Sequence, residues 1–214
     1  HCNTHSSFKD KVYMSNLCQE ITLPTKPIQH IDDSQGEIAL CILSAINLGL
    51  IKEKDELEEL CDLSVRALDE IIDYQEYPVQ AAKISTEARR SLGIGYIGLA
   101  HFLAKNKVKY DDKQALKLVD EITEAFQYYL LKASNDLAQE KGKCDYFDRT
   151  KYADGILPID TYKKDLDNIV KRKLSYDWST LRKDIQEHGL RHSTLSAQMP
   201  SESSSVVSNA TNGI

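Results

Sequence analysis

Apolar residues recur at helical spacing over two long stretches of the chain. In residues 54–75 and in residues 113–140 they lie mostly three or four positions apart, which predicts two amphipathic helices. Asp111 or Asp112 is expected at the start of the second helix, and Gly142 follows its end. The apolar positions of the first helix are Leu57, Leu60, Cys61, Val65, Leu68, Ile71 and Ile72, and those of the second are Leu116, Val119, Phe126, Leu130, Ala133 and Leu137.

Three other stretches have weaker patterns. Residues 177–188 predict a shorter helix, with Asp177 as its cap and Gly189 just after its end. Residues 37–49 are mostly apolar, and their pattern leaves a buried strand and a buried helix both open. Residues 1–36 contain several turn formers, so we expect them to be irregular.

Composition narrows the class of protein. The 214 residues suffice for one large domain or two small ones, and 41% hydrophobic with 28% charged residues is typical of a globular protein. No apolar run approaches the ~18 residues that a membrane span needs, so we expect no membrane association. The net charge of −6 argues against a nucleic-acid binder, which usually carries a basic face.

The cysteines indicate the redox environment of the protein, and the ends of the chain bear on whether it is a segment. The five cysteines are widely spaced and include no CxxC pair, which argues against a disulfide framework or a zinc ribbon and favours a reducing, cytoplasmic location. His1, Cys2 and His5 lie together, but their number and spacing match no zinc site, so we expect no metal. A chain that starts with His1 and ends at Ile214 is expected to be a segment of a longer protein. The cysteines are Cys2, Cys18, Cys41, Cys61 and Cys144.

Asn16, Cys18 and Glu20 alternate along the chain and form the first candidate site. In an extended segment all three side chains would project to one face, whereas a helix would turn Cys18 away from the other two. An amide, a thiol and a carboxylate together could hold hydroxyls, supply a nucleophile or radical, and accept a proton. On spacing alone the pattern is a weak signal.

Gly93, Gly95 and Gly98 match the GxGxxG pattern of dinucleotide-binding loops. That pattern requires an apolar strand directly before it, whereas residues 87–91 are polar and charged. Tight packing of a buried strand or helix start is therefore the favoured interpretation, because glycine permits close approach.

A third candidate lies in the hydroxyl-rich residues 199–205. Consecutive hydroxyls and backbone N–H groups at the start of a helix can bind phosphate, aided by the helix dipole. A plain helix cap with a capping box is the alternative.

Taken together, these segments resemble the large subunit of aerobic, class I ribonucleotide reductases. The likeness runs in order through essentially all 214 residues, which makes it far more specific than any single motif. The segments that carry it are residues 15–21, 23–27, 36–41, 89–95, 128–135, 155–162 and 199–204.

The resemblance implies catalytic roles. Cys18 matches the cysteine whose thiyl radical removes the ribose 3′-hydrogen, and Glu20 matches the glutamate that takes the 3′-hydroxyl proton. Asn16 matches the asparagine that binds the substrate and helps the 2′-hydroxyl to leave. Cys41 matches one of two cysteines that supply electrons and become a disulfide. Cys61 has no such role, and its place on the apolar stripe of a helix indicates a core residue.

The resemblance also implies a binding site for the substrate diphosphate. The family often has threonine where Ser203 stands, a mild departure that keeps the hydroxyl. Residues expected at this site are Pro200, Ser201, Glu202, Ser203 and Ser204.

The fold and the partners follow from the same resemblance. We expect an α/β fold with several long helices, in which residues 1–214 form one segment, about the second half, of the family's ten-stranded α/β catalytic barrel. The implied partners are a ribonucleoside diphosphate, a small subunit whose two metal ions generate the radical, thioredoxin or glutaredoxin, and a second large chain. Nucleoside triphosphate effectors would bind elsewhere in the longer chain. No cofactor is expected within this segment, which should be inactive by itself.

Two other functions remain open at this point. A nucleotide-binding oxidoreductase would use residues 93–98 and would not need Cys18. A non-catalytic, reductase-like scaffold would tolerate replacement of Cys18, Glu20 and Cys41.

Overall fold

A pair of parallel strands lies at the centre of the computed structural model, which describes residues 7–169 and 173–214. β1 (Ile42–Asn47) pairs with β2 (Leu92–Ile97) along their whole lengths. The helices α2 (Glu56–Tyr74) and α3 (Gln80–Arg89) connect them, as a crossover between parallel strands requires. Ser196 forms a further parallel bridge to β2, so residues 194–199 run beside it as a third extended segment.

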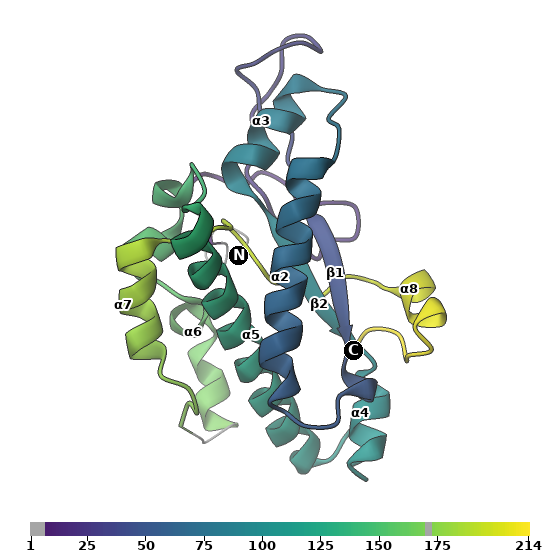
Figure 1. The fold of residues 1–214 in the computed structure, drawn as a ribbon. Helices are drawn as coiled ribbons and strands as arrows, with labels where there is room; N and C mark the ends of the chain where they lie inside the picture. Colours follow the sequence, from purple (N-terminus) through teal and green to yellow (C-terminus); the bar gives the residue numbers. More distant parts are fainter. Residues whose placement is uncertain (1–6, 170–172) are drawn as a thin grey trace.

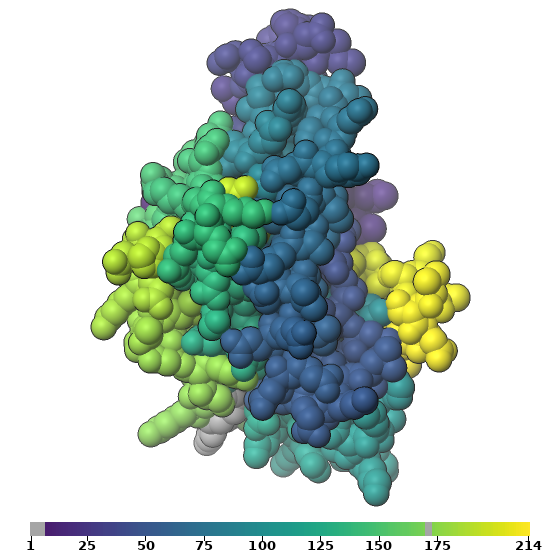
Figure 2. Space-filling model, in the orientation of Figure 1, coloured from purple at the N-terminus to yellow at the C-terminus, as the bar shows by residue number. Residues whose placement is uncertain are grey.

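Helices cover one face of these strands (Figure 1). The long helix α5 (Lys113–Lys141) packs against α2, and α7 (Trp178–His188) flanks α5 on its outer side. Figure 2 shows α2 and α5 forming a continuous surface, while α8 (Glu202–Val207) stands out at the edge. The remaining elements are α4 (Leu99–Lys105), α6 (Pro158–Thr161) and the 3-10 helices η1 (Leu48–Leu50), η2 (Phe147–Arg149), η3 (Lys151–Asp154) and η4 (Lys164–Asn168).

The two faces of β2 differ. Leu92, Ile94 and Tyr96 belong to the main hydrophobic core, together with apolar side chains of α2 and α5. Gly93 and Gly95 alternate with them, because successive residues of a strand point to opposite faces. The glycine face meets Cys41, Ala197 and Met199 instead of the helices.

The predicted helices are confirmed. Residues 54–75 contain α2, residues 113–140 lie within α5, and residues 177–188 contain α7. Asp177 caps α7, since its carboxylate accepts the Thr180 N–H at 3.0 Å. The apolar residues 37–49 contain β1, which decides between strand and helix.

Two details of the predicted apolar stripes are wrong. Leu116 is 53% exposed, because Ala115, one position earlier, faces the core in the first turn of α5. Ile71 is 42% exposed, whereas Ile72 is fully buried. Neighbouring helix positions differ by about 100° around the axis, so at the edge of the apolar face one residue can be buried while the next is exposed.

None of the described helices combines the length and the apolar character needed to span a bilayer.

Candidate active site

The segment with Asn16, Cys18 and Glu20 folds as a tight turn. The Gln19 N–H donates to the Asn16 carbonyl oxygen at 3.2 Å, and Gln19 has a φ of 62°. The Asn16 side-chain oxygen accepts the Ile21 N–H at 3.3 Å, a local bond that favours turns. The segment is therefore a turn and not the extended arrangement in which the three side chains would share one face, because this side-chain hydrogen bond closes the backbone on itself.

The turn gives its members different surroundings. Cys18 is exposed at the tip, beside Leu17, which is 95% exposed. Glu20 is half-buried, and its Oε2 atom is buried without a hydrogen-bond partner among the described residues. An unpaired buried carboxylate oxygen is costly, so it marks a place where a ligand, water or further protein group would be stabilising.

Cys41 lies directly before β1 and approaches this glutamate. Its side chain packs with a small apolar cluster that includes Ile21, from the same loop as Glu20. Burial and the nearby Glu20 carboxylate raise the pKa of the Cys41 thiol to about 12. The thiol therefore stays protonated at neutral pH, and it can deliver both a proton and an electron.

Glycine at position 93 makes room for that thiol. A β-carbon placed there would lie 2.9 Å from the Cys41 sulfur and 2.6 Å from the Leu43 side chain. The same strand position also faces Ala197, 3.1 Å from the added carbon. The space beside Cys41 thus depends on the missing side chain.

A cavity of ≈ 410 Å³ with both polar and apolar lining residues adjoins Glu20. Gln127 of α5 lines it, with a buried Nε2 atom that has no partner among the described residues. Its Oε1 atom accepts the Ser196 hydroxyl at 2.7 Å. Sequence reasoning missed Gln127 and Ser196, because neither belongs to a spaced motif of chemical groups.

Asn16 lines a different and larger cavity, of ≈ 790 Å³, on another side of the loop. Its lining is mainly apolar and includes Leu23, Pro27 and Ile38. Ile21 borders both cavities and separates them. The Glu20 carboxylate is thus near enough to raise the pKa of the Cys41 thiol, whereas Cys18 lies at the exposed tip and Asn16 borders the apolar cavity.

The hydroxyl-rich segment forms the short helix α8. Ser201 precedes it, is buried, and donates its N–H and hydroxyl to the Asn212 side-chain oxygen at 3.3 and 3.0 Å. The plain capping box is wrong, since the Ser204 hydroxyl donates to the Ser201 carbonyl oxygen at 3.0 Å. Pro200, Glu202, Ser203 and Ser204 are exposed.

This segment is fastened to the carboxyl ends of the strands. The Asn47 side chain donates to the Ser208 carbonyl oxygen at 3.2 Å, and the Gly98 N–H donates to that of Thr211 at 2.9 Å. Open α/β sheets commonly bind ligands at the carboxyl edge of their strands. Cys41 lies at the opposite end, directly before β1.

The glycine pattern does not form a phosphate-binding loop. Gly93 and Gly95 lie inside β2, and only Gly98, with a φ of 77°, follows the strand. A β-carbon on Gly95 would lie 2.5 Å from the Ala197 carbonyl oxygen. The close-packing interpretation is confirmed, because a dinucleotide fingerprint needs its glycines in the turn after the strand.

Cys61 and Cys144 lie away from this site. Cys61 and Cys144 are buried, and burial raises the pKa of both thiols to about 12. His1, Cys2 and His5 lie outside the described residues. Within residues 7–169 and 173–214, no group of three metal-ligating side chains is suited to a metal ion.

Comparison with known proteins gives one consistent family. Residues 1–214 match the family model described as ribonucleotide reductase, barrel domain. The chain is 65% identical, over its full length, to 29% of the ribonucleoside-diphosphate reductase subunit alpha of Haemophilus influenzae. It is 60% identical to 28% of the ribonucleoside-diphosphate reductase 1 subunit alpha of Escherichia coli. Over 96% of the chain it is 46% identical to 27% of the subunit alpha of phage T4. The chain thus spans less than a third of these relatives.

Proposed function

The chain belongs to the ribonucleotide reductase family, as part of the barrel domain, and from this we propose that its parent protein reduces ribonucleoside diphosphates to 2′-deoxyribonucleoside diphosphates. The relatives are alpha subunits of this enzyme. The observation that best supports the proposal is the match of residues 1–214 to the ribonucleotide reductase barrel domain, with the Cys41 thiol buried near the turn that carries Cys18 and Glu20.

The proposed reaction starts at Cys18. Its thiyl radical takes the hydrogen from C3′ of the ribose, and the Glu20 carboxylate accepts the proton of the 3′-hydroxyl. The 2′-hydroxyl then leaves as water, assisted by the Asn16 amide. The exposed tip suits this role, because the sulfur of Cys18 must reach the ribose directly.

The lost water must be balanced by two electrons and two protons. Cys41 and a second cysteine of the parent protein supply them and become a disulfide, and Cys18 then returns the hydrogen to C3′. Burial keeps the Cys41 thiol protonated, which suits a group that must give up a hydrogen. A thiol reductant of the thioredoxin or glutaredoxin class would reopen the disulfide.

The diphosphate is assigned to the start of α8. Ser203 and Ser204 present exposed hydroxyls there, and Ser201 is held by Asn212. The position at the carboxyl edge of the strands supports this assignment. Glu202 and Pro200 border the same turn.

A partner subunit is part of the proposal. The relatives' designation as subunit alpha agrees with a second, radical-generating subunit, whose two metal ions would supply the oxidising equivalent. A second copy of the large chain, and effector sites for nucleoside triphosphates outside residues 1–214, complete the expected assembly. Residues 1–214 expressed alone should not reduce nucleotides, because the second redox cysteine is expected elsewhere.

The test uses the full-length parent protein with its radical-generating subunit. Reduction of CDP is measured for wild type, Cys18→Ala, Glu20→Gln and the control Cys144→Ala, which alters a buried cysteine away from the site. We expect Cys18→Ala and Glu20→Gln to abolish or severely reduce turnover, and Cys144→Ala to retain it. Full turnover by Cys18→Ala would refute the mechanism, whereas an inactive wild type would favour a non-catalytic scaffold role.

A further inference from the structure

The loop that carries the proposed catalytic groups has two ends that are pinned to the body of the protein. We define the catalytic loop as residues 11–36. Before it, the Lys9 N–H donates to the Arg149 carbonyl oxygen at 2.9 Å. At the other end, Lys26 within the loop and Glu37 just after it exchange two backbone hydrogen bonds of 3.0 Å. Between these points the loop has turns and no regular strand or helix.

One buried arginine contacts the residue before the loop and the residue after it. Arg89, the last residue of α3, is 2% exposed. Its Nη1 and Nη2 atoms each donate to Asp10 Oδ2 at 3.1 Å, and its Nε atom donates to Glu37 Oε2 at 2.8 Å. A single guanidinium therefore joins Asp10 to Glu37.

Other groups hold this guanidinium in place. Arg89 lies 5.6 Å from the centre of the Phe8 ring and 5.0 Å from that of Tyr146, within reach of cation–π attraction. Arg149 adds a second link, with Nε 2.9 Å from Asp10 Oδ2 and Nη1 3.4 Å from Glu37 Oε1.

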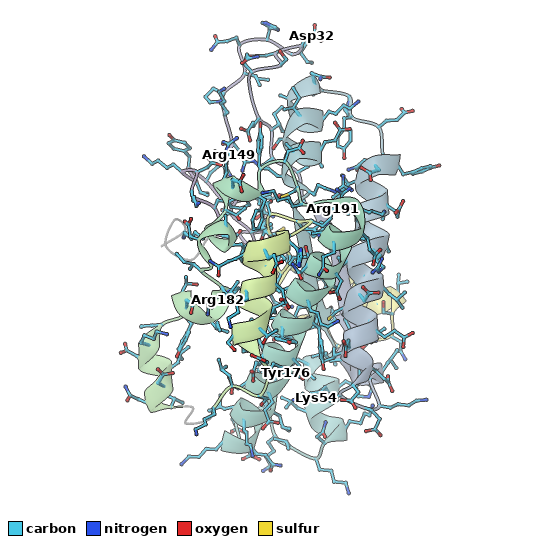
Figure 3. The ribbon with its side chains drawn as sticks, turned by 60° about the vertical axis from the view of Figure 1, so that its left-hand side comes forward. Asp32, Lys54, Arg149, Tyr176, Arg182 and Arg191 are labelled. Carbon is cyan, nitrogen blue, oxygen red and sulfur yellow. The ribbon has the colours of Figure 1, made fainter. Side chains whose placement is uncertain are left out.

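The cluster is balanced in charge. Two arginines face two carboxylates, so the buried charges of Arg89 and Glu37 are compensated, with the partly exposed Asp10 and Arg149 at the rim. Figure 3 shows Arg149 where the loop that reaches Asp32 joins the body of the molecule.

We propose that Arg89 is a positioning residue that clamps the two ends of the catalytic loop and thereby holds Cys18 and Glu20 in place relative to Cys41. This inference rests on the proposed function for its effect on turnover, but the clamp itself is a property of the loop. Arginine is needed because its planar fork can serve two carboxylates in fixed directions, whereas a lysine ammonium cannot span them in the same way.

The next residue provides a matched control. Arg90 is also buried, at 4% exposure, and also pairs with two carboxylates. Its Nε atom donates to Asp69 Oδ1 at 2.6 Å, and its Nη1 atom donates to Asp73 Oδ1 at 2.7 Å. Both partners lie on α2, away from the catalytic loop, because the left-handed backbone of Arg90, with a φ of 47°, directs its side chain elsewhere.

The experiment compares Arg89→Lys, Glu37→Gln and Arg90→Lys in the full-length parent protein with its radical-generating subunit. Amide hydrogen exchange over residues 11–36 reports the clamp, and kcat and KM for CDP reduction report its consequence. We expect Arg89→Lys and Glu37→Gln to accelerate exchange in the loop by about tenfold, from the loss of charge-assisted bonds. We expect kcat to fall by about 100-fold for Arg89→Lys, as a misplacement of about 1 Å can cause, with KM within about twofold.

Arg90→Lys should leave loop exchange and kcat close to wild type, even where it lowers the melting temperature. Equal effects of Arg90→Lys and Arg89→Lys would overturn the clamp, since general destabilisation would then explain both. Unchanged loop exchange in Arg89→Lys and Glu37→Gln would overturn it as well. A wild-type protein without reductase activity would refute the proposed function, while the exchange comparison would still decide the clamp.

Discussion

Replacing Gly93 by alanine tests whether the space beside Cys41 is needed for turnover. The new methyl carbon would start 2.9 Å from the Cys41 sulfur, 2.6 Å from Leu43 Cδ2 and 3.1 Å from Ala197 Cβ. Leu43 is 46% exposed and can rotate away, whereas the Cys41 thiol is packed between the strands and the loop. The sulfur must therefore move by roughly half an ångström or more to reach an ordinary contact distance.

The magnitude follows from two general rules. Overpacking by one methyl group costs about 1–3 kcal/mol of stability. A displacement of about 1 Å of a reacting group can cost about 100-fold in rate, so a shift of half that size should lower turnover by about tenfold. We expect the fold to survive and the rate to fall.

The assay is single-turnover reduction of CDP by the full-length parent protein without added thiol reductant. This condition isolates the electrons supplied by Cys41 and its partner cysteine. Gly142→Ala is the control, because no atom lies within 4 Å of a β-carbon at that position, although its φ of 89° makes the backbone cost real. A wild-type rate for Gly93→Ala, in a protein that otherwise depends on Cys41, would refute the reasoning.

Three further predictions concern stability, each measured as the melting temperature of the full-length protein. Burial lowers the pKa of His192, so the imidazole binds a proton more readily in the unfolded chain than in the folded one. The protein should therefore lose stability as the pH drops below about 6.5, the ordinary histidine pKa. His192→Gln should weaken this pH dependence. An unchanged pH dependence in the variant would contradict this. Leu130→Ala should lower the free energy of unfolding by about 2–5 kcal/mol, because the Leu130 side chain is fully buried. Leu116→Ala should lower it by under about 0.5 kcal/mol, because that side chain is exposed. Equal effects would contradict the observed orientation of α5. Asp177→Ala should lower the free energy of unfolding by about 0.5–2 kcal/mol, because the helix loses the hydrogen bond that the Thr180 N–H donates to the Asp177 carboxylate. Asp177→Asn keeps an acceptor oxygen and should retain most of this stability. An unchanged stability in Asp177→Ala would show that the cap is not stabilising.

The buried polar cluster around Asp69 joins residues that are far apart in the sequence, so the pattern of residues along the chain could not predict it. Asp69 Oδ1 lies 3.1 Å from His192 Nε2, and the Ser134 hydroxyl lies 2.9 Å from His192 Nδ1. The arrangement has the order of a hydrolase triad, but all three residues are fully buried. Without access for a substrate it serves as a structural network, and only the packing of α2, α5 and residues 190–193 makes that clear.

The candidate site was partly predictable. Residue spacing marked Asn16, Cys18 and Glu20, and family resemblance added Cys41 and the segment at Ser203. The geometry of the turn was not predictable from alternation, because the turn is closed by the Ile21 N–H donating to the Asn16 side-chain oxygen and by backbone hydrogen bonds within residues 16–21. Gln127 and Arg89 were invisible as site residues, since their partners lie far away in the chain.

The helices over residues 54–75, 113–140 and 177–188 are predictable from the sequence, because the spacing of apolar residues and the residues at helix ends act over one or a few helical turns. The family is predictable from it as well, through segments in a shared order. Long-range contacts in the fold decide that residues 37–49 contain a strand, that Gly93 and Gly95 lie inside its partner strand, and that the Glu20 carboxylate raises the pKa of the Cys41 thiol. Those outcomes depend on contacts between distant parts of the chain, for which a local pattern carries no information.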